Sequence, residues 1–172
     1  MLYLQQITSP LDEIDFVAMG RTCYGHAARR TANLLTRHYN RHMNDVGLEL
    51  TQAQLLAVIA DGSAQSASEI ARYLGIDRST LARNLKPLES AGLISRQETS
   101  GRTVLPILTP SGQAKVVEIH ERWQQAQLEI SELLGSEGAD AVRAHMSALR
   151  KAVHILEERE NAQSTPTAHQ SL

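Results

Sequence analysis

The chain has 172 residues, of which 42% are hydrophobic and 21% are charged, and its formal net charge is -2. This length fits a single domain with a sizeable core, and this composition excludes a disordered or fibrous protein. No apolar run approaches the roughly 20 residues that cross a bilayer, and the N-terminus lacks the basic and apolar segments of a secretory signal. We therefore expect a cytoplasmic protein without a membrane partner, and the single cysteine, Cys23, agrees with a reducing compartment.

Basic residues gather in two segments although the total charge is near zero. Residues 21–44 contain five arginines and no acidic residue, and residues 66–102 contain six basic residues against four acidic ones. From residue 118 onward acidic residues predominate. A phosphate group senses charges within a Debye length of about 8 to 10 Å, so these segments are compatible with nucleic-acid binding.

Two helices are predicted before residue 62. The first begins near Phe16 and ends at Gly47, because apolar and aromatic side chains recur at steps of three and four residues. A shorter helix over QAQLLAVIA follows, with Thr51 as its N-cap and Asp61-Gly62 at its end. The stripe of the first helix consists of Tyr24, Ala28, Thr31, Leu35, Tyr39 and Met43.

The segment EIARYLGIDRSTLARNLKP has the pattern of two helices joined by a tight turn. Such a pair needs a small residue where the helices cross, a left-handed residue in the turn and an apolar residue that locks the second helix. Ala71, Gly75 and Leu81 occupy these positions. Ser68 is the expected N-cap of the first helix, and Asp77 is that of the second.

The second helix of this pair is predicted to present a polar, cationic face opposite Leu81 and Leu85. An arginine can bind guanine O6 and N7 with two hydrogen bonds, and a serine or threonine can bind a phosphate or a base edge. This face is therefore predicted to be the recognition surface of a helix-turn-helix. Pro87 is expected to kink the helix or loosen its last turns. The predicted DNA-contacting residues are Arg78, Ser79, Thr80, Arg83 and Lys86.

Two short β-prone runs, residues 93–98 and 103–108, are joined by a glycine-containing turn at residues 99–102. A hairpin that follows a helix-turn-helix is a wing, and Arg102 at its tip is predicted to enter the adjacent minor groove. Pro106 indicates a short strand, or a strand whose missing donor points away from the ladder.

Two further helices are predicted near the C-terminus. Thr109 caps the first of them with Pro110 at its first position, and residues 135–138 separate it from the last helix. In both helices apolar side chains repeat at close to 3.5 residues, which predicts a seam against another helix. The tail from Asn161 has no period and is predicted to be disordered. The seams comprise Val116, His120, Trp123, Gln127, Ile130 and Leu134, and then Val142, Met146, Leu149, Val153 and Leu156.

Over roughly residues 20–157 the sequence resembles the MarR family of winged-helix transcriptional regulators. The resemblance rests on LTQAQLLAVI, SASEIARYLGIDRSTLARNLKPLESAGLISR and LTPSGQA, in this order and at the family's spacing. It implies a mainly α fold, in which a winged helix-turn-helix with a small β-hairpin wing is joined to long N- and C-terminal dimerisation helices. Two such lobes in a homodimer are expected to contact a pseudo-palindromic operator in double-stranded DNA. The expected parts are residues 1–50 (N-terminal arm and dimerisation helix), 51–108 (DNA-binding lobe), 109–160 (C-terminal dimerisation helices) and 161–172 (disordered tail).

The resemblance also implies control by a small molecule. We expect a repressor that is released by a phenolic or other aromatic or lipophilic ligand, and that needs no cofactor. The wing departs from the family pattern, because the usual Asp-x-Arg or Asp-Arg-Arg tip is replaced by Ser100-Gly101-Arg102. By resemblance, the ligand pocket is expected to be lined by Tyr24, Ala28, Thr31 and Gln52.

Cys23 has two interpretations. It is either a small buried hydrophobe at the dimer interface or a redox sensor of an organic hydroperoxide or an electrophile, because organic-hydroperoxide sensors in this family use one cysteine on the first helix. Those sensors pair the thiol with two tyrosines. Tyr39 is a candidate for one of them, at a longer spacing than in the sensors, and the other would fall near Gln52, which has no phenol.

Three other classes of function are weighed against DNA binding. No phosphate-cradling glycine loop, nucleophile elbow or HExxH motif is present, so an enzyme is not expected. His38 and His42 lie one helical turn apart, but no Cys, Asp or Glu accompanies them at ligand spacing, so no metal is expected either. A winged helix used for protein contacts is the remaining alternative, and a flat salt dependence of DNA binding would favour it.

Overall fold

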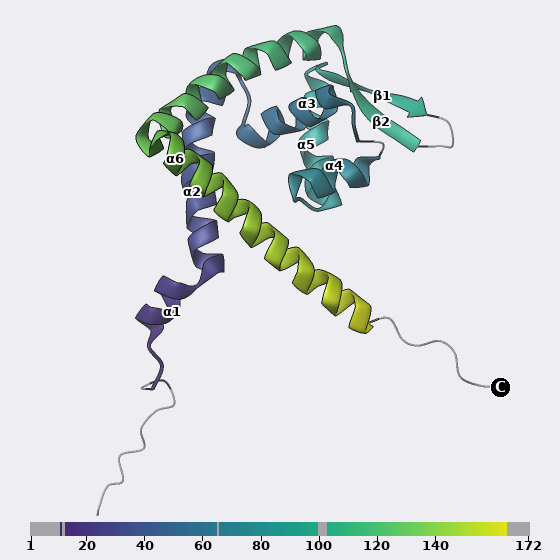
Figure 1. Ribbon diagram of the computed structural model, residues 1–172. Helices are drawn as coiled ribbons and strands as arrows, with labels where there is room; N and C mark the ends of the chain where they lie inside the picture. The colour runs from purple at the N-terminus through teal and green to yellow at the C-terminus, as the bar shows by residue number, and fades with distance from the viewer. Residues whose placement is uncertain (1–10, 12, 65, 100–102, 165–172) are drawn as a thin grey trace, which may run out of the picture. The chain divides into compact units, whose positions relative to one another are not determined.

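The computed structural model describes residues 11, 13–64, 66–99 and 103–164 (Figure 1). The chain forms two compact units, one of residues 1–123 and one of residues 124–172. Apart from one two-stranded hairpin, the regular elements in the described residues are helical, which confirms the mainly α prediction. Among the described residues, no helix has both the length and the apolar character that a bilayer crossing requires.

The predicted first helix is interrupted, so the expectation of one continuous helix is wrong. Helix α1 spans Phe16–Thr22 and helix α2 spans Tyr24–Met43, with Cys23 in extended backbone between them. The interruption has a local cause, because the Cys23 sulfur accepts the backbone N–H three residues further on at 3.4 Å and so starts a new helix. A 3-10 turn, η1 (Asn44–Val46), follows, and Gly47 has the left-handed φ of 74° that the sequence predicts for the helix end.

Helix α3 spans Leu50–Asp61, so it begins one residue before Thr51, the predicted cap. Its N-cap is Glu49, whose backbone N–H donates to the Gln52 side-chain oxygen at 3.0 Å. The side chain of Asn40 on α2 accepts the first helical N–H of α3 at 2.7 Å. Because Gln52 and Asn40 accept the backbone N–H groups of Glu49 and Leu50, the helix begins earlier than residue type alone predicts.

Helices α4 (Ala67–Leu74) and α5 (Arg78–Ser90) form the predicted tight pair. The N-cap of α4 is Ser66, not Ser68, and its hydroxyl oxygen accepts the backbone N–H three residues further on at 3.1 Å. The turn between the helices needs a left-handed residue, and Gly75 supplies it with a φ of 65°. The helix-turn-helix prediction is therefore confirmed, with one cap displaced.

Strands β1 (Ile94–Thr99) and β2 (Thr103–Leu108) form an antiparallel hairpin after α5. Arg96 is paired in register with Pro106. A two-stranded sheet has only edge strands, so a proline can stand in β2 with its missing donor on the unpaired side. The turn at residues 100–102, which includes the predicted minor-groove contact, lies outside the described residues.

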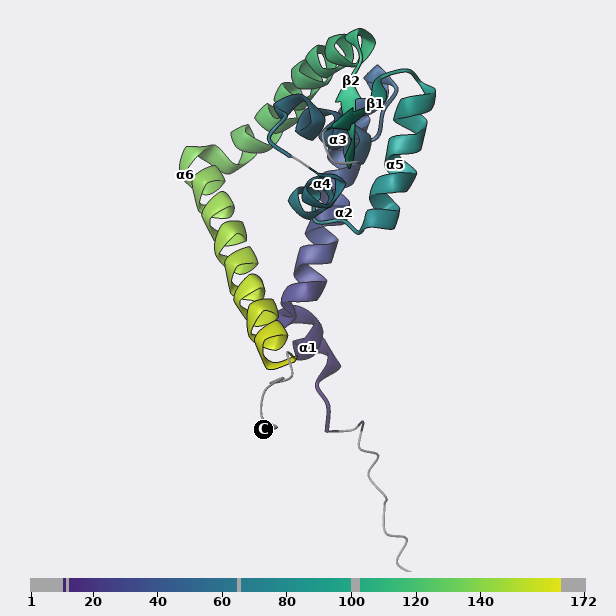
Figure 2. The same cartoon turned by 90° about the vertical axis from the view of Figure 1, so that its right-hand side faces the viewer.

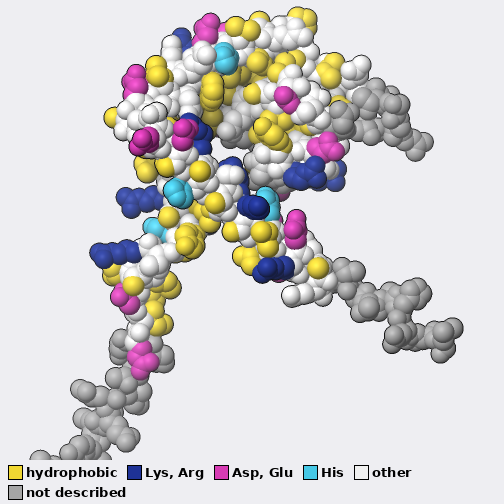
Figure 3. Space-filling model, in the orientation of Figure 1, with side chains coloured by type: hydrophobic (Ala, Val, Ile, Leu, Met, Phe, Trp, Pro, Cys, Tyr) yellow, Lys and Arg dark blue, Asp and Glu magenta, His cyan; other side chains and the backbone are white. Residues whose placement is uncertain are grey.

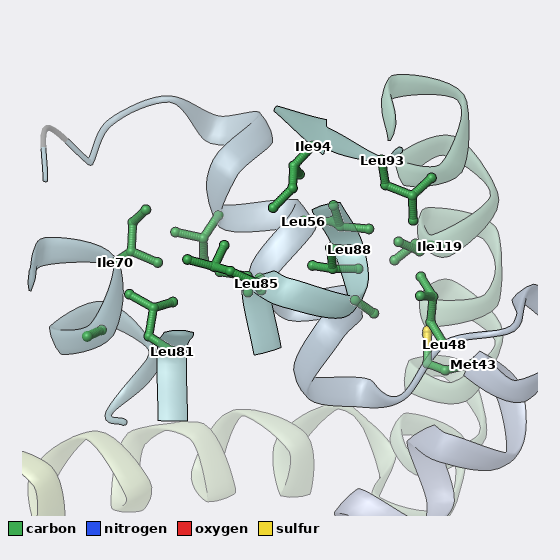
Figure 4. Packing of buried hydrophobic residues seen from close by; sticks show 14 residues of the cluster. Met43, Leu48, Leu56, Ile70, Leu81, Leu85, Leu88, Leu93, Ile94 and Ile119 are labelled. Carbon is green, nitrogen blue, oxygen red and sulfur yellow. The ribbon is translucent and has the colours of Figure 1, made fainter. Parts of the chain in front are cut away.

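The core of the first unit is formed where α3, α4 and α5 pack against the hairpin, the end of α2 and the start of α6 (Pro110–Ser164) (Figure 4). Leu81 and Leu85 face inward, as the sequence predicts, and Leu56 is fully buried between the helices. In Figure 2, α5 runs along the outer edge of this unit, and the side of α5 that faces away from the unit is uncovered. The other buried members include Met43, Leu48, Leu55, Ile70, Ala71, Leu88, Leu93, Ile94 and Ile119.

Helix α6 begins at Pro110, as predicted, and extends to Ser164. The hydroxyl of Thr109 accepts the N–H of Gly112 at 3.1 Å and donates to the carbonyl oxygen of Gly92 at 2.6 Å. Thr109 therefore caps the helix and ties its start to the end of α5.

Helix α6 is broken where the sequence predicts it, but it ends later than predicted. Gly135 has a φ of 68° and a ψ of 168°, so the helix is broken at the first of the four residues predicted to separate two helices. The disordered tail predicted from Asn161 is wrong for its first residues, because the helix continues to Ser164. An established helix extends through residues that have no apolar period, since propagation needs only one further hydrogen bond per residue. Residues 165–172 lie outside the described part of the chain.

Candidate nucleic-acid interface

The N-terminus of α5 is organised by Asp77. Its carboxylate accepts the backbone N–H of Thr80 at 2.8 Å, the hydroxyl of Thr80 at 2.7 Å and the hydroxyl of Ser79. The Ser79 and Thr80 donors favour the ionised carboxylate and hold the pKa of Asp77 well below its ordinary range. The predicted capping role of Asp77 is thus present, and the cap also fixes the side chains of Ser79 and Thr80.

The pKa of Asp77 makes the stability of the fold depend on pH. Because the pKa in the folded state lies below that in the unfolded state, the ionised carboxylate stabilises the fold above about pH 4 and loses this effect as the pH falls further. We expect Asp77→Asn to lower the midpoint of thermal unfolding at pH 7 and to match the native chain more closely near pH 3. Calorimetry across this range measures the difference. A constant difference at all pH values would contradict the role of the charged cap.

Thr80 links the cap to Arg83. Its hydroxyl donates to Asp77 and accepts a hydrogen bond from the Arg83 guanidinium at 2.9 Å. Its backbone carbonyl accepts the Asn84 side-chain N–H at 2.9 Å. The half-buried Thr80 therefore has its hydroxyl engaged on both sides, by Asp77 and by Arg83.

The remaining predicted contacts lie on the exposed side of α5. Arg78, Ser79, Arg83 and Lys86 are exposed, whereas the leucines of the same helix are buried. The helix continues through Pro87 for three more residues, so it presents this face over its whole length. An exposed helix that carries arginine, lysine and hydroxyl side chains on one face has the width and the donors to enter a DNA major groove.

One ion pair at this site was missed by sequence reasoning. The Arg96 Nε of β1 donates to the Glu89 carboxylate of α5 at 2.7 Å, which ties the wing to the recognition helix. The sequence did offer a sign of this ion pair, because the oppositely charged Glu89 and Arg96 flank the turn at Gly92. An isolated hairpin is marginally stable, so such ties contribute to the orientation of the wing.

The predicted ligand-pocket residues lie on two different elements. Tyr24, Ala28 and Thr31 follow one exposed side of α2, and Tyr24 is 77% exposed. Gln52 is half-buried at the start of α3, where its side-chain oxygen accepts the Glu49 N–H.

Cys23 is exposed at the junction of α1 and α2, where its sulfur accepts the His26 N–H. Tyr39 lies 16 residues further along, close to the other end of α2. At 1.5 Å per residue this places the two side chains about 24 Å apart along the helix, so Tyr39 cannot bind the thiol of its own chain.

The fold and this face define a winged helix-turn-helix protein of the DNA-binding type. The sequence profile of the MarR family matches residues 46–102. The chain is 30% identical to the transcriptional regulator MosR of M. tuberculosis, over 79% of this chain and 98% of that one, with a TM-score of 0.70. The structure of MosR in complex with DNA aligns with a TM-score of 0.69 at 29% identity, over 78% of this chain and 98% of that one. The chain belongs to the MarR family of transcriptional regulators.

A curated relative agrees with this membership. The uncharacterized HTH-type transcriptional regulator YwoH of Bacillus subtilis (strain 168) is 26% identical over 106 residues, which cover 61% of this chain and 77% of YwoH. Both relatives carry the name of a transcriptional regulator.

Proposed function

We propose that the chain acts as a homodimeric, sequence-specific repressor of transcription that a small molecule releases from double-stranded DNA. The observation that carries the proposal is the exposed face of α5, on which Asp77 and Thr80 hold Arg83 in place. In a symmetric dimer two such helices enter successive major grooves, about 34 Å apart, of a pseudo-palindromic operator.

The side chains of this face have distinct roles in the proposal. Arg83 reads a base edge, because its guanidinium can form two parallel hydrogen bonds with guanine. Arg78, Ser79 and Lys86 bind phosphates and fix the register of the helix on the duplex. Arg102, outside the described residues, is proposed to reach the minor groove.

Dimerisation is supported by apolar side chains that the single chain leaves exposed. On α1, Phe16, Val17 and Met19 are more than half exposed, and the C-terminal part of α6 exposes a stripe that includes Val153 and Leu156. Contiguous exposed apolar surface on a soluble chain indicates a partner surface. In the proposed dimer a second copy covers both stripes.

In this proposal the effector releases the dimer from DNA by changing the distance between its two α5 helices. A ligand bound beside Tyr24, Ala28, Thr31 and Gln52 favours a dimer in which the helices no longer match successive grooves. Its class is proposed to be aromatic or lipophilic, because the exposed phenol of Tyr24 offers a stacking surface.

The proposal is tested by selecting genomic DNA fragments with the purified full chain and sequencing them. We expect a shared pseudo-palindrome in the recovered fragments. A duplex that contains it should bind at least 1,000-fold more tightly than a scrambled duplex of equal length, as is typical for specific regulators. Recovery of fragments without a common sequence would contradict specific recognition.

Thr80 offers a test of how Arg83 is oriented. Thr80→Val keeps the shape of the side chain but removes the hydroxyl that binds Arg83, so we expect specific binding to weaken roughly two- to tenfold, as for one lost hydrogen bond. Thr80→Ser keeps the hydroxyl and should bind like the native chain. Fluorescence anisotropy with the selected duplex measures both. Equal affinity of Thr80→Val and the native chain would show that Arg83 needs no such support.

A redox-sensing regulator is a second candidate, favoured by the exposed thiol of Cys23 at the start of α2. Oxidation of an accessible thiol to a sulfenic acid changes its size and hydrogen bonding at the hinge between two helices. We expect cumene hydroperoxide to release the native chain from its operator and to leave Cys23→Ser bound. Equal release of both chains would eliminate this candidate.

A further inference from the structure

Helix α2 carries a basic face that the proposed DNA contacts do not use. Its 20 residues include four arginines and three histidines and no acidic residue. His26, Arg29, Arg30 and Arg37 lie at steps of three, one and seven residues, which places them on one side of the helix. Over the limb that α1 and α2 form, Figure 3 shows dark blue side chains projecting into solvent.

Within the described part of the chain, no carboxylate compensates the arginine charges of this face. Among the described residues, none of the guanidinium groups of Arg29, Arg30 and Arg37 has a carboxylate within ion-pair distance. Arg41 is different, because its guanidinium donates to the Nδ1 atom of His38 at 3.0 Å. Three cations on about 12 Å of helix repel one another, and a multivalent anion would remove this repulsion.

The same residues surround a hollow. It has a volume of about 400 Å³ and is lined by the four basic side chains together with Asn33 and Leu34. Sites for small molecules begin at roughly 300 Å³, so the hollow has room for a compact group. Leu34 is 52% exposed beside the cations and offers apolar contact to the rest of such a molecule.

We infer that this face binds the diphosphate group of a small molecule. A single carboxylate would neutralise only one of the three guanidinium groups, whereas a terminal phosphate alone carries close to two charges. Guanidinium groups bind phosphate oxygens through two parallel hydrogen bonds, and clustered arginines provide several such forks. A DNA duplex is far larger than a hollow of about 400 Å³, whereas a diphosphate fits within it. Binding at this face does not depend on the proposed function of α5.

Isothermal titration of the full chain, without DNA, tests the inference. The probes are inorganic pyrophosphate and ADP, and the variant is Arg29→Gln/Arg37→Gln, which keeps the helix propensity nearly unchanged. We expect the variant to bind at least one probe at least tenfold more weakly than the native chain. Tighter binding of ADP than of pyrophosphate identifies an esterified diphosphate as the ligand, and the reverse order identifies the free anion.

The matched control is Arg150→Gln/Arg159→Gln, which removes the same charge from exposed positions of α6. It should bind the probes like the native chain, and circular dichroism checks that both variants are folded. Equal weakening in both variants, or no binding of either probe to the native chain, would overturn the inference. If neither probe binds but Arg29→Gln/Arg37→Gln reduces the salt dependence of duplex binding, the face contacts the DNA backbone and the inference is wrong.

Discussion

Arg83→Ala is expected to weaken binding to the specific operator by about 1 to 3 kcal/mol, which is roughly 5- to 150-fold. The alanine loses both hydrogen bonds that the guanidinium is proposed to form with a base. Binding to a scrambled duplex should change far less, because phosphate contacts supply most nonspecific affinity. Fluorescence anisotropy with both duplexes at one salt concentration measures the two effects.

Arg83→Lys separates charge from geometry. The lysine keeps the positive charge but lacks the planar fork, so nonspecific binding should equal that of the native chain and specific binding should stay impaired. Arg150→Ala, at an exposed position of α6, should behave like the native chain. If Arg83→Ala lowers binding to both duplexes by the same factor, Arg83 binds a phosphate and does not read a base.

Gly112→Ala is expected to cause the largest loss of stability. A Cβ atom at this position would lie 1.9 Å from the carbonyl oxygen of Leu93, which is backbone and cannot rotate away. Leu93 is buried between α5 and β1, and its carbonyl also accepts the N–H of Thr109. The start of α6 must therefore move as a whole, and we expect a loss of about 3 kcal/mol or more in the free energy of unfolding. Chemical denaturation monitored by circular dichroism measures it.

The matched control for this substitution is Gly20→Ala in α1. A Cβ atom there meets nothing within 4 Å, and alanine favours a helix over glycine by roughly 0.5 to 1 kcal/mol. The control should be as stable as the native chain or slightly more stable. If Gly112→Ala and the native chain have the same denaturant concentration at the midpoint of unfolding, α6 does not pack this closely against Leu93.

The elements that sequence predicts best are those fixed by local rules. Gly75, Asp77 and Leu81 occupy the turn, the cap and the lock of a helix pair, and each requirement involves residues close in sequence. The starts of α3 and α4 were predicted two residues too late, because Thr51 and Ser68 are favoured caps by residue type alone. The actual starts depend on which side chains accept the first backbone N–H groups of each helix. For α3 one of these acceptors is Asn40 of α2, which lies too far away in the sequence for a local rule to include it.

The sequence predicted which side chains of α5 are exposed, but not the hydrogen bonds between them. The spacing of α5 placed Arg78, Arg83 and Lys86 on one exposed side, which the structure confirms. Spacing does not reveal that the Thr80 hydroxyl is already engaged by Asp77 and Arg83, since this depends on side-chain rotamers. The break at Cys23 was missed for a similar reason, because the apolar period continues across it.

We propose that the exposed face of α5 binds DNA, and the salt dependence of operator binding measures the phosphate contacts of this face. Each phosphate neutralised by a basic side chain contributes about -0.9 to the slope of log K against log salt. We predict a steep negative slope for the native chain, and a slope shallower by about one unit in each of Arg78→Gln and Lys86→Gln. A flat dependence in the native chain, or a steep slope that neither substitution changes, would contradict the claim.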